Sequence, residues 1–184
     1  MVWDRLVRTT HWLNASLFLL GYFVFEEGED WHRWAGYALV ASTFLRIVWG
    51  FTSTGPARFS HFFPRSKTLQ AHLSDLKLRP FSRGGLHYTF DHNPLAALMC
   101  FFLWFALLST ALSGWLLTLD YFWGSEVMEV THEWAANVTL FAAGCHVLAV
   151  GVMSYWYNKN LLKAMLWSRS GSQSSATENG IQEE

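Results

Sequence analysis

The segment from Trp134 to Tyr157 contains no Lys, Arg, Asp or Glu and is long enough to cross a bilayer. Three further apolar stretches satisfy or approach the length of about 20 residues that a hydrocarbon layer requires; they lie at about 6–25, 33–51 and 94–119. Water is absent from the bilayer core, so each stretch must satisfy its own backbone hydrogen bonds, which favours helices. The sequence therefore predicts an all-α integral membrane protein, a bundle of four antiparallel helices.

The composition supports this class. Hydrophobic residues make up 52% and aromatic residues 17% of the 184 positions, which is too apolar for an ordinary soluble domain. We expect one membrane domain over residues 1–169, with a basic loop at 52–91, and a disordered tail at 170–184 that is rich in Ser, Gln and Glu. Cys100 and Cys145 both lie in apolar stretches and no Cys-x-x-Cys-His occurs, which argues against covalent haem attachment.

The distribution of charge predicts the orientation in the membrane. Basic residues precede the first stretch, fill the 52–91 loop and follow the fourth stretch, whereas acidic residues occupy the other two connections. Lys and Arg are enriched in cytoplasmic loops. We therefore expect a multi-pass protein of the bacterial inner membrane, surrounded by lipid, with both termini in the cytoplasm.

Histidines on the apolar stretches suggest a cofactor. His132 and His146 are 14 residues apart, so on one helix they lie about 21 Å apart along the axis and on nearly the same face. Counting inward from the predicted membrane boundaries places His11 level with His146, and His32 level with His132. The sequence therefore predicts two histidine pairs, one toward each membrane surface and each bridging two helices, as cofactor sites in bundles do.

A pair of facing imidazoles in lipid fits a b-type haem, whose iron accepts an axial nitrogen on each side of the ring. Zinc favours about four clustered ligands, and no further candidates converge at either level. Small residues could leave space for a flat macrocycle or could serve helix packing; they are Gly36, Gly50, Gly144 and Gly151. A histidine at a helix start is often only a solvated polar residue. A mid-span histidine such as His146 is costly and is functional by default.

The chain also resembles the bacterial cytochrome b561 and nickel-iron hydrogenase cytochrome b group from about Val2 to Arg169. The resemblance rests on the order and spacing of short segments: Thr10-His11-Trp12, Trp31-His32, Gly36-Tyr37, Phe44-Leu45-Arg46, Trp49-Gly50, His92-Asn93-Pro94-Leu95, His132-Glu133, Ala143 to Val150, and Asn160 to Met165. It implies a four-helix di-haem membrane cytochrome. The four iron ligands in this group match His11, His32, His132 and His146.

Two further residues are candidates for cofactor binding. Arg46 lies near the cytoplasmic end of the second stretch, where its guanidinium could pair with a haem propionate, or could simply extend to the membrane surface. His92 precedes Asn93-Pro94, a helix-start pattern. It either belongs to surface structure or lies near an inner propionate or a quinone.

The resemblance further implies that electrons pass between periplasmic redox proteins and quinone. With the histidine pairs, this leads us to expect two haem b groups that carry electrons across the membrane between a periplasmic redox partner, such as a cytochrome c, and quinone in a respiratory chain. The acidic outer connections could attract a basic partner; a nucleic-acid partner is not expected. One alternative is a membrane anchor and electron conduit of a hydrogenase-like complex, and another is a stand-alone superoxide or quinone oxidoreductase. A third is a haem-free bundle whose histidines relay protons. Haem absorbance and copurifying subunits, not the residues, distinguish these readings.

Overall fold

The computed structural model describes residues 4–54, 57–63, 69–70, 74, 94–156 and 160–166. Every regular element among them is a helix, which confirms the all-α prediction for this part of the chain. The elements are α1 (Arg5–Phe23), α2 (Asp30–Thr52), α3 (Phe59–Phe62), α5 (Pro94–Leu116), α6 (Glu126–Trp156) and α7 (Leu161–Leu166). The predicted tail at 170–184 and most of the 52–91 loop lie outside the described residues.

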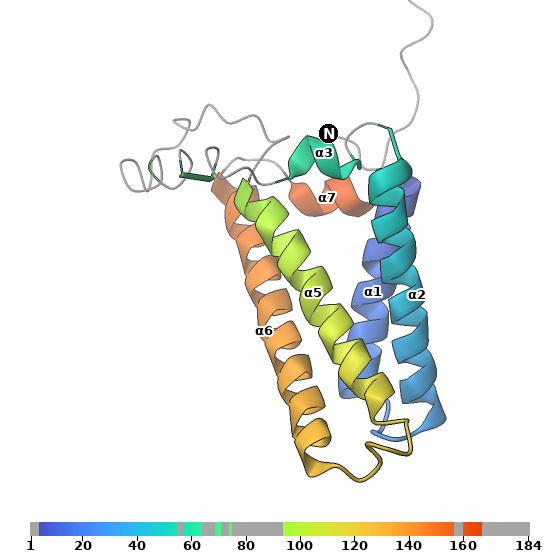
Figure 1. Ribbon diagram of the computed structural model, residues 1–184. Helices are drawn as coiled ribbons and strands as arrows, with labels where there is room; N and C mark the ends of the chain where they lie inside the picture. The colour runs from blue at the N-terminus through green and yellow to red at the C-terminus, as the bar shows by residue number, and fades with distance from the viewer. Residues whose placement is uncertain are drawn as a thin grey trace, which may run out of the picture.

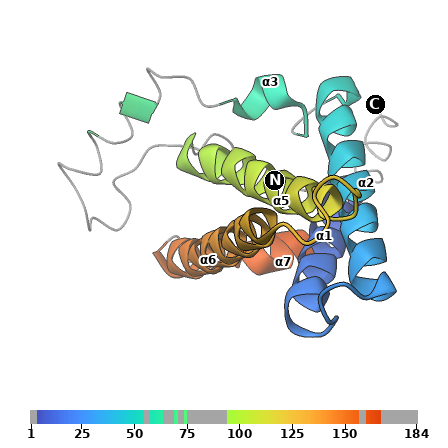
Figure 2. The same ribbon diagram turned by 60° about the horizontal axis from the view of Figure 1, so that its bottom comes forward.

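The long helices form two hairpins that lie side by side, α1 with α2 and α5 with α6 (Figures 1 and 2). Each hairpin connection contains a glycine at positive φ, Gly28 at 82° and Gly124 at 72°, a conformation that other residues rarely adopt. The hairpins meet mainly where α2 packs on α5. Near the connections, the Tyr22 hydroxyl of α1 also donates a 2.6 Å hydrogen bond to Asn137 Oδ1 of α6.

The two ends of the molecule differ in charge. Both connections lie at one end, called here the acidic end, which carries Glu26, Glu27, Glu29, Asp30, Asp120, Glu126 and Glu129. The start of α1 and the short helices α3 and α7 lie at the opposite end, called here the basic end, with Arg5, Arg8, Arg58 and Lys163 (Figure 1). The start and the end of the described chain therefore lie at the same end of the molecule.

Among the described helices, three are long and apolar enough to cross a membrane, namely α2, α5 and α6. The first predicted span is also helical, as α1, but the polar residues Arg8, His11 and Asn14 make it less apolar than the other three. Its 19 residues extend about 28 Å, close to the thickness of a hydrocarbon core. Large apolar side chains on all four helices are exposed, for example Phe105 at 70% and Phe141 at 75%, as a lipid-facing surface requires.

The helix boundaries differ from the predicted spans mainly at α6. This helix begins at Glu126, eight residues before the apolar run that starts at Trp134. Its first eight residues include Glu126, Glu129 and Glu133, because a membrane helix can continue into water beyond the hydrocarbon layer. His132 consequently lies inside the helix, with a full turn before it, rather than at its first turn.

Polar residues hold the helices of each hairpin together. Asn14 Nδ2 of α1 donates a hydrogen bond of 3.1 Å to Thr43 Oγ1 of α2, and the Thr110 and Thr139 hydroxyls of α5 and α6 lie 3.0 Å apart. Thr43 and Thr139 are the largest fully buried side chains among the described residues. Lipid offers these groups no hydrogen-bond partner, so small polar residues at the contacts fix the register of the paired helices.

Side-chain contacts also fix the basic end. Asp4 caps α1, because its Oδ1 accepts from the Val7 amide at 2.8 Å, and its Oδ2 accepts from Trp49 Nε1 of α2 at 2.9 Å. The Trp12 indole of α1 donates to the Met165 carbonyl of α7 at 3.3 Å. These bonds join the first helix to the end of the second and to the last helix described.

Candidate functional site

The structure brings the four predicted histidines together in two pairs. The His32 and His132 rings have centroids 6.1 Å apart and form the acidic-end pair. The His11 and His146 rings have centroids 6.3 Å apart and form the basic-end pair. Helix α6 supplies one ring to each pair, and the partners come from α2 and α1 respectively. The pairing inferred from depth alone is therefore the pairing of the folded chain.

The ring separations suit two imidazoles on opposite sides of one metal ion. A nitrogen–metal bond is about 2 Å long, and each ring centre lies roughly 1 Å beyond its nitrogen, so a pair of axial ligands has centroids about 6 Å apart. Plain aromatic pairs also occur at 4.5–7 Å. Metal-binding imidazoles and a plain aromatic pair differ in whether the ring nitrogens have a binding partner.

Two of these nitrogens are buried and have no hydrogen-bond partner among the residues that the structure describes, Nδ1 of His11 and Nδ1 of His32. A buried polar group without a partner costs about 1–3 kcal/mol and in a native protein calls for an explanation, such as a bound ion. Direct packing of two neutral rings would add nothing to set against this cost. A metal ion bound between the rings would coordinate one nitrogen of each imidazole and so offset the cost, even where the other nitrogen keeps no partner, and the residues therefore fit such a group.

His132 is held differently. Its Nδ1 lies 3.0 Å from the Thr110 carbonyl oxygen and 3.1 Å from Ser113 Oγ, both on α5. A carbonyl can only accept a hydrogen bond, so we assign the proton to Nδ1, which leaves the lone pair on Nε2. A metal-binding histidine commonly has this arrangement, in which the second nitrogen donates to a carbonyl and fixes the ring.

Glycines next to the histidines fall into two groups. A Cβ added to Gly114 of α5 would lie 2.8 Å from Cε1 of the His132 ring, so this glycine is needed for the ring's position. A Cβ added to Gly36, one turn after His32, or to Gly144 would meet nothing within 4 Å. Gly36 and Gly144 therefore do not serve close helix packing, and the space beside them is open.

Gly50, unlike Gly36 and Gly144, has no open space beside it. A Cβ there would clash with the Phe59 ring, so this glycine accommodates α3 rather than leaving space for a macrocycle. The same Phe59 ring lies 5.7 Å from the guanidinium carbon of Arg46, and the Trp104 ring of α5 lies 5.2 Å from it. Cation–π contacts of this kind stabilise a charge that is removed from water.

Arg46 lies at the level of the basic-end pair. It follows His32 by 14 residues on α2, which is the same spacing as between His132 and His146 on α6. It is only 5% exposed, so the guanidinium does not extend to the surface. Its Nη2 donates to the Ala57 carbonyl at 3.4 Å, whereas Nη1 is buried and has no partner in the described part of the chain. A buried guanidinium with a free donor can bind an anionic group.

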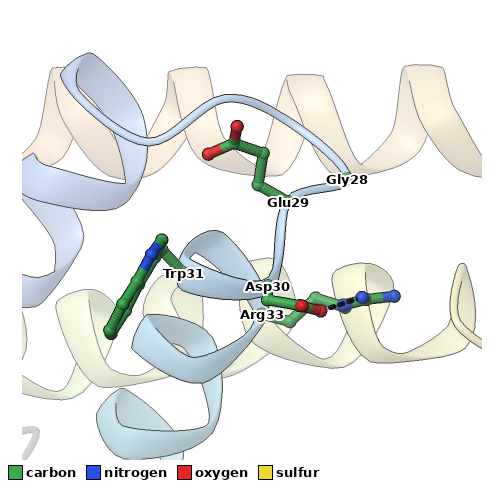
Figure 3. A pocket seen from close by; sticks show the side chains of 5 residues that line it. All are labelled: Gly28, Glu29, Asp30, Trp31 and Arg33. Carbon is green, nitrogen blue, oxygen red and sulfur yellow. Dashed lines mark hydrogen bonds and ion pairs between the residues drawn. The ribbon is translucent and has the colours of Figure 1, made fainter.

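The last candidate from the sequence, His92, lies outside the described residues. No group of three or more His, Cys, Asp or Glu side chains with metal-binding geometry occurs among residues that the structure describes. An open hollow at the acidic end is lined by Gly28, Glu29, Asp30, Trp31 and Arg33, with Arg33 paired to Asp30 (Figure 3). None of the four histidines lines this hollow.

One comparison with known proteins identifies the family. A family model described as prokaryotic cytochrome b561 matches residues 2–168. The chain belongs to the prokaryotic cytochrome b561 family. Members of this family are membrane electron-transfer proteins, and membership implies that the chain binds haem b. No curated protein and no solved structure matches the chain significantly.

Three residues around His132 were not predicted from the sequence, namely Thr110, Ser113 and Gly114. The signal for them was weak, because a serine or threonine within an apolar helix usually bonds only to its own backbone. Ser113 and Gly114 become informative only when α5 is aligned with α6. That alignment depends on tertiary packing, which spacing within one helix does not reveal.

Gly114→Ala provides a test of the geometry around His132. Alanine favours a helix more than glycine by about 1 kcal/mol, so α5 itself should not be weakened. The added methyl group would displace the His132 ring, and we expect haem affinity at the acidic-end pair to fall about 10–100-fold, as for other disruptions of ligand orientation. Haem content per chain after dilution measures this. Gly21→Ala on α1, where the new Cβ meets nothing within 4 Å, is the control; equal haem content in both variants would refute the assignment.

Proposed function

We propose that this chain is a di-haem cytochrome that moves electrons across the bacterial inner membrane, between a periplasmic redox protein and the quinone pool of a respiratory chain. The observation that carries the proposal is the presence of two imidazole pairs, with centroids 6.1 and 6.3 Å apart, at two levels of one helix. Each haem b would supply one reversible electron-transfer centre. His32 and His132 would hold one haem, and His11 and His146 the other.

The arrangement of the helices supports a path across the membrane. His132 and His146 are separated by about 21 Å along α6, most of the thickness of a hydrocarbon core of about 30 Å. In the proposed topology α1 also crosses the membrane, which gives four spans in all. Both termini are cytoplasmic, and the acidic end faces the periplasm. The basic residues at the opposite end agree with the preference for positive charge on the cytoplasmic side.

Transmembrane electron transfer can be measured directly in proteoliposomes that contain the purified chain and trapped ferricyanide. Addition of dithionite outside should reduce the trapped ferricyanide, because the two pairs together bridge the bilayer. His132→Ala and His146→Ala should each abolish this reduction. Val147→Ala, a lipid-facing neighbour of His146 that is 67% exposed, should retain it. Full reduction by either histidine variant would contradict the proposal.

Arg46 is proposed to bind a propionate of the haem at the basic-end pair. This agrees with its burial, its level on α2 and its free Nη1 donor. A nearby positive charge disfavours the ferric state, so Arg46→Gln should lower the redox potential of that haem and leave the other unchanged. A spectroscopic redox titration measures both potentials, with the exposed Arg33→Gln as the charge control. An unchanged potential in Arg46→Gln would exclude the pairing.

The acidic end is proposed to attract a basic redox partner such as a cytochrome c. Seven carboxylates lie there, all of them in exposed residues, and opposite charge raises association rates by long-range attraction. Rates of electron exchange with a basic cytochrome c should therefore fall as ionic strength rises from low to physiological values. Rates independent of salt would show that charge does not guide the encounter.

A further inference from the structure

His132 is the one histidine of the two pairs whose Nδ1 the structure shows bound to a neighbouring helix. Its two partners on α5 are themselves connected, because the Ser113 hydroxyl donates to the Thr110 carbonyl at 2.9 Å while its oxygen lies 3.1 Å from Nδ1. Ser113 is 6% exposed. The imidazole, the hydroxyl and the carbonyl thus form a closed hydrogen-bonded triangle within an apolar environment.

The geometry assigns a direction to each bond in this triangle. The carbonyl accepts from both groups, so the Ser113 proton points to Thr110 and the oxygen of Ser113 faces the Nδ1–H of His132. Donation to the carbonyl polarises the hydroxyl and makes its oxygen a better acceptor. The Nδ1–H is therefore shared between two acceptors, which increases the electron density that Nε2 offers to a bound metal.

We propose that Ser113 is a positioning residue that sets the redox potential of the haem at the acidic-end pair. This inference rests on the proposed function, namely that His32 and His132 hold a haem. A more electron-rich axial imidazole stabilises ferric iron and lowers the potential. Ser113 acts on that iron only through His132.

The effect should be confined to one haem. Nδ1 of His11 in the basic-end pair has no hydrogen-bond partner within the described chain, and neither has Nδ1 of His32. Ser113 lies at the acidic end of α5, three residues before the last residue of that helix, Leu116. Along the bundle, Ser113 is about as far from the basic-end pair as the two histidine pairs are from each other. The haem of the basic-end pair is therefore an internal reference in the same molecule.

A purely structural role of Ser113 is separable from this one. The Thr110–Thr139 hydroxyl contact holds α5 against α6 one turn away, and the Thr110 carbonyl remains an acceptor for His132 when Ser113 is replaced. Ser113→Ala thus removes one of two acceptors without removing the bonds that fix the helix register. Loss of packing would lower haem retention, whereas loss of the acceptor changes the potential of a haem that stays bound.

The test is a redox titration, followed by haem absorbance, of the wild type, Ser113→Ala and Ser109→Ala in the same detergent. Ser109 is the matched control because it lies one turn from Ser113 on α5 and its hydroxyl is not a partner of His132 Nδ1. The component that disappears in His132→Ala identifies the haem of the acidic-end pair. We expect Ser113→Ala to shift this component to higher potential, with the other component and both components of Ser109→Ala unchanged.

Each other outcome has a definite meaning. An unchanged or lowered potential of the identified component in Ser113→Ala, or an equal shift of both components, overturns the role of Ser113 while the di-haem proposal stands. A wild type with no component that depends on His132 overturns the proposed function and, with it, this inference. Retention of the unshifted component in Ser113→Ala shows that the variant is folded.

Discussion

The arrangement of the helices depends on the spacing of two histidines along α6. Fourteen residues separate His132 from His146 on α6, which returns the two rings to nearly the same face about 21 Å apart. Each ring is paired with a ring from a different helix, α2 at the acidic end and α1 at the basic end, which requires both helices of the first hairpin to lie beside α6. The side-by-side arrangement of the two hairpins satisfies this requirement (Figure 2).

Polar groups inside the apolar helices are the second determinant of the arrangement. Thr139 lies midway between His132 and His146 and is 1% exposed, and it contacts Thr110 across the hairpin. Asn14 and Thr43 form the corresponding contact in the other hairpin. A bilayer cannot hydrogen-bond such groups, so each contact selects one register of its helix pair. That register in turn brings Thr110, Ser113 and Gly114 to His132.

Much of this could be predicted from the sequence. The ranges of α1, α2 and α5 follow from runs of apolar residues, and the pairing of the histidines follows from the fixed rise of an α-helix. The start of α6 could not be predicted in this way, because its first eight residues are helical but lie beyond the apolar run. Hydropathy measures the part of a helix that lies in lipid, not the helix itself.

Contacts between helices were also beyond the sequence. Gly50 was a candidate for macrocycle space, but the Phe59 ring occupies that position, because α3 folds back over the end of α2. The burial of Arg46 between Phe59 and Trp104 has the same cause. The carbonyl that orients His132 carries no signal of its own, since every residue has one. Such features arise where separate elements pack together, and the local patterns of a single sequence do not reveal how they pack.

Whether each histidine pair holds one haem can be decided by a pyridine haemochrome assay of haem b per chain. We expect two haems in the wild-type chain and one in each of His132→Ala and His146→Ala, with a different haem lost in the two variants. A wild-type chain with fewer than two haems, or a histidine variant that retains both, would contradict it.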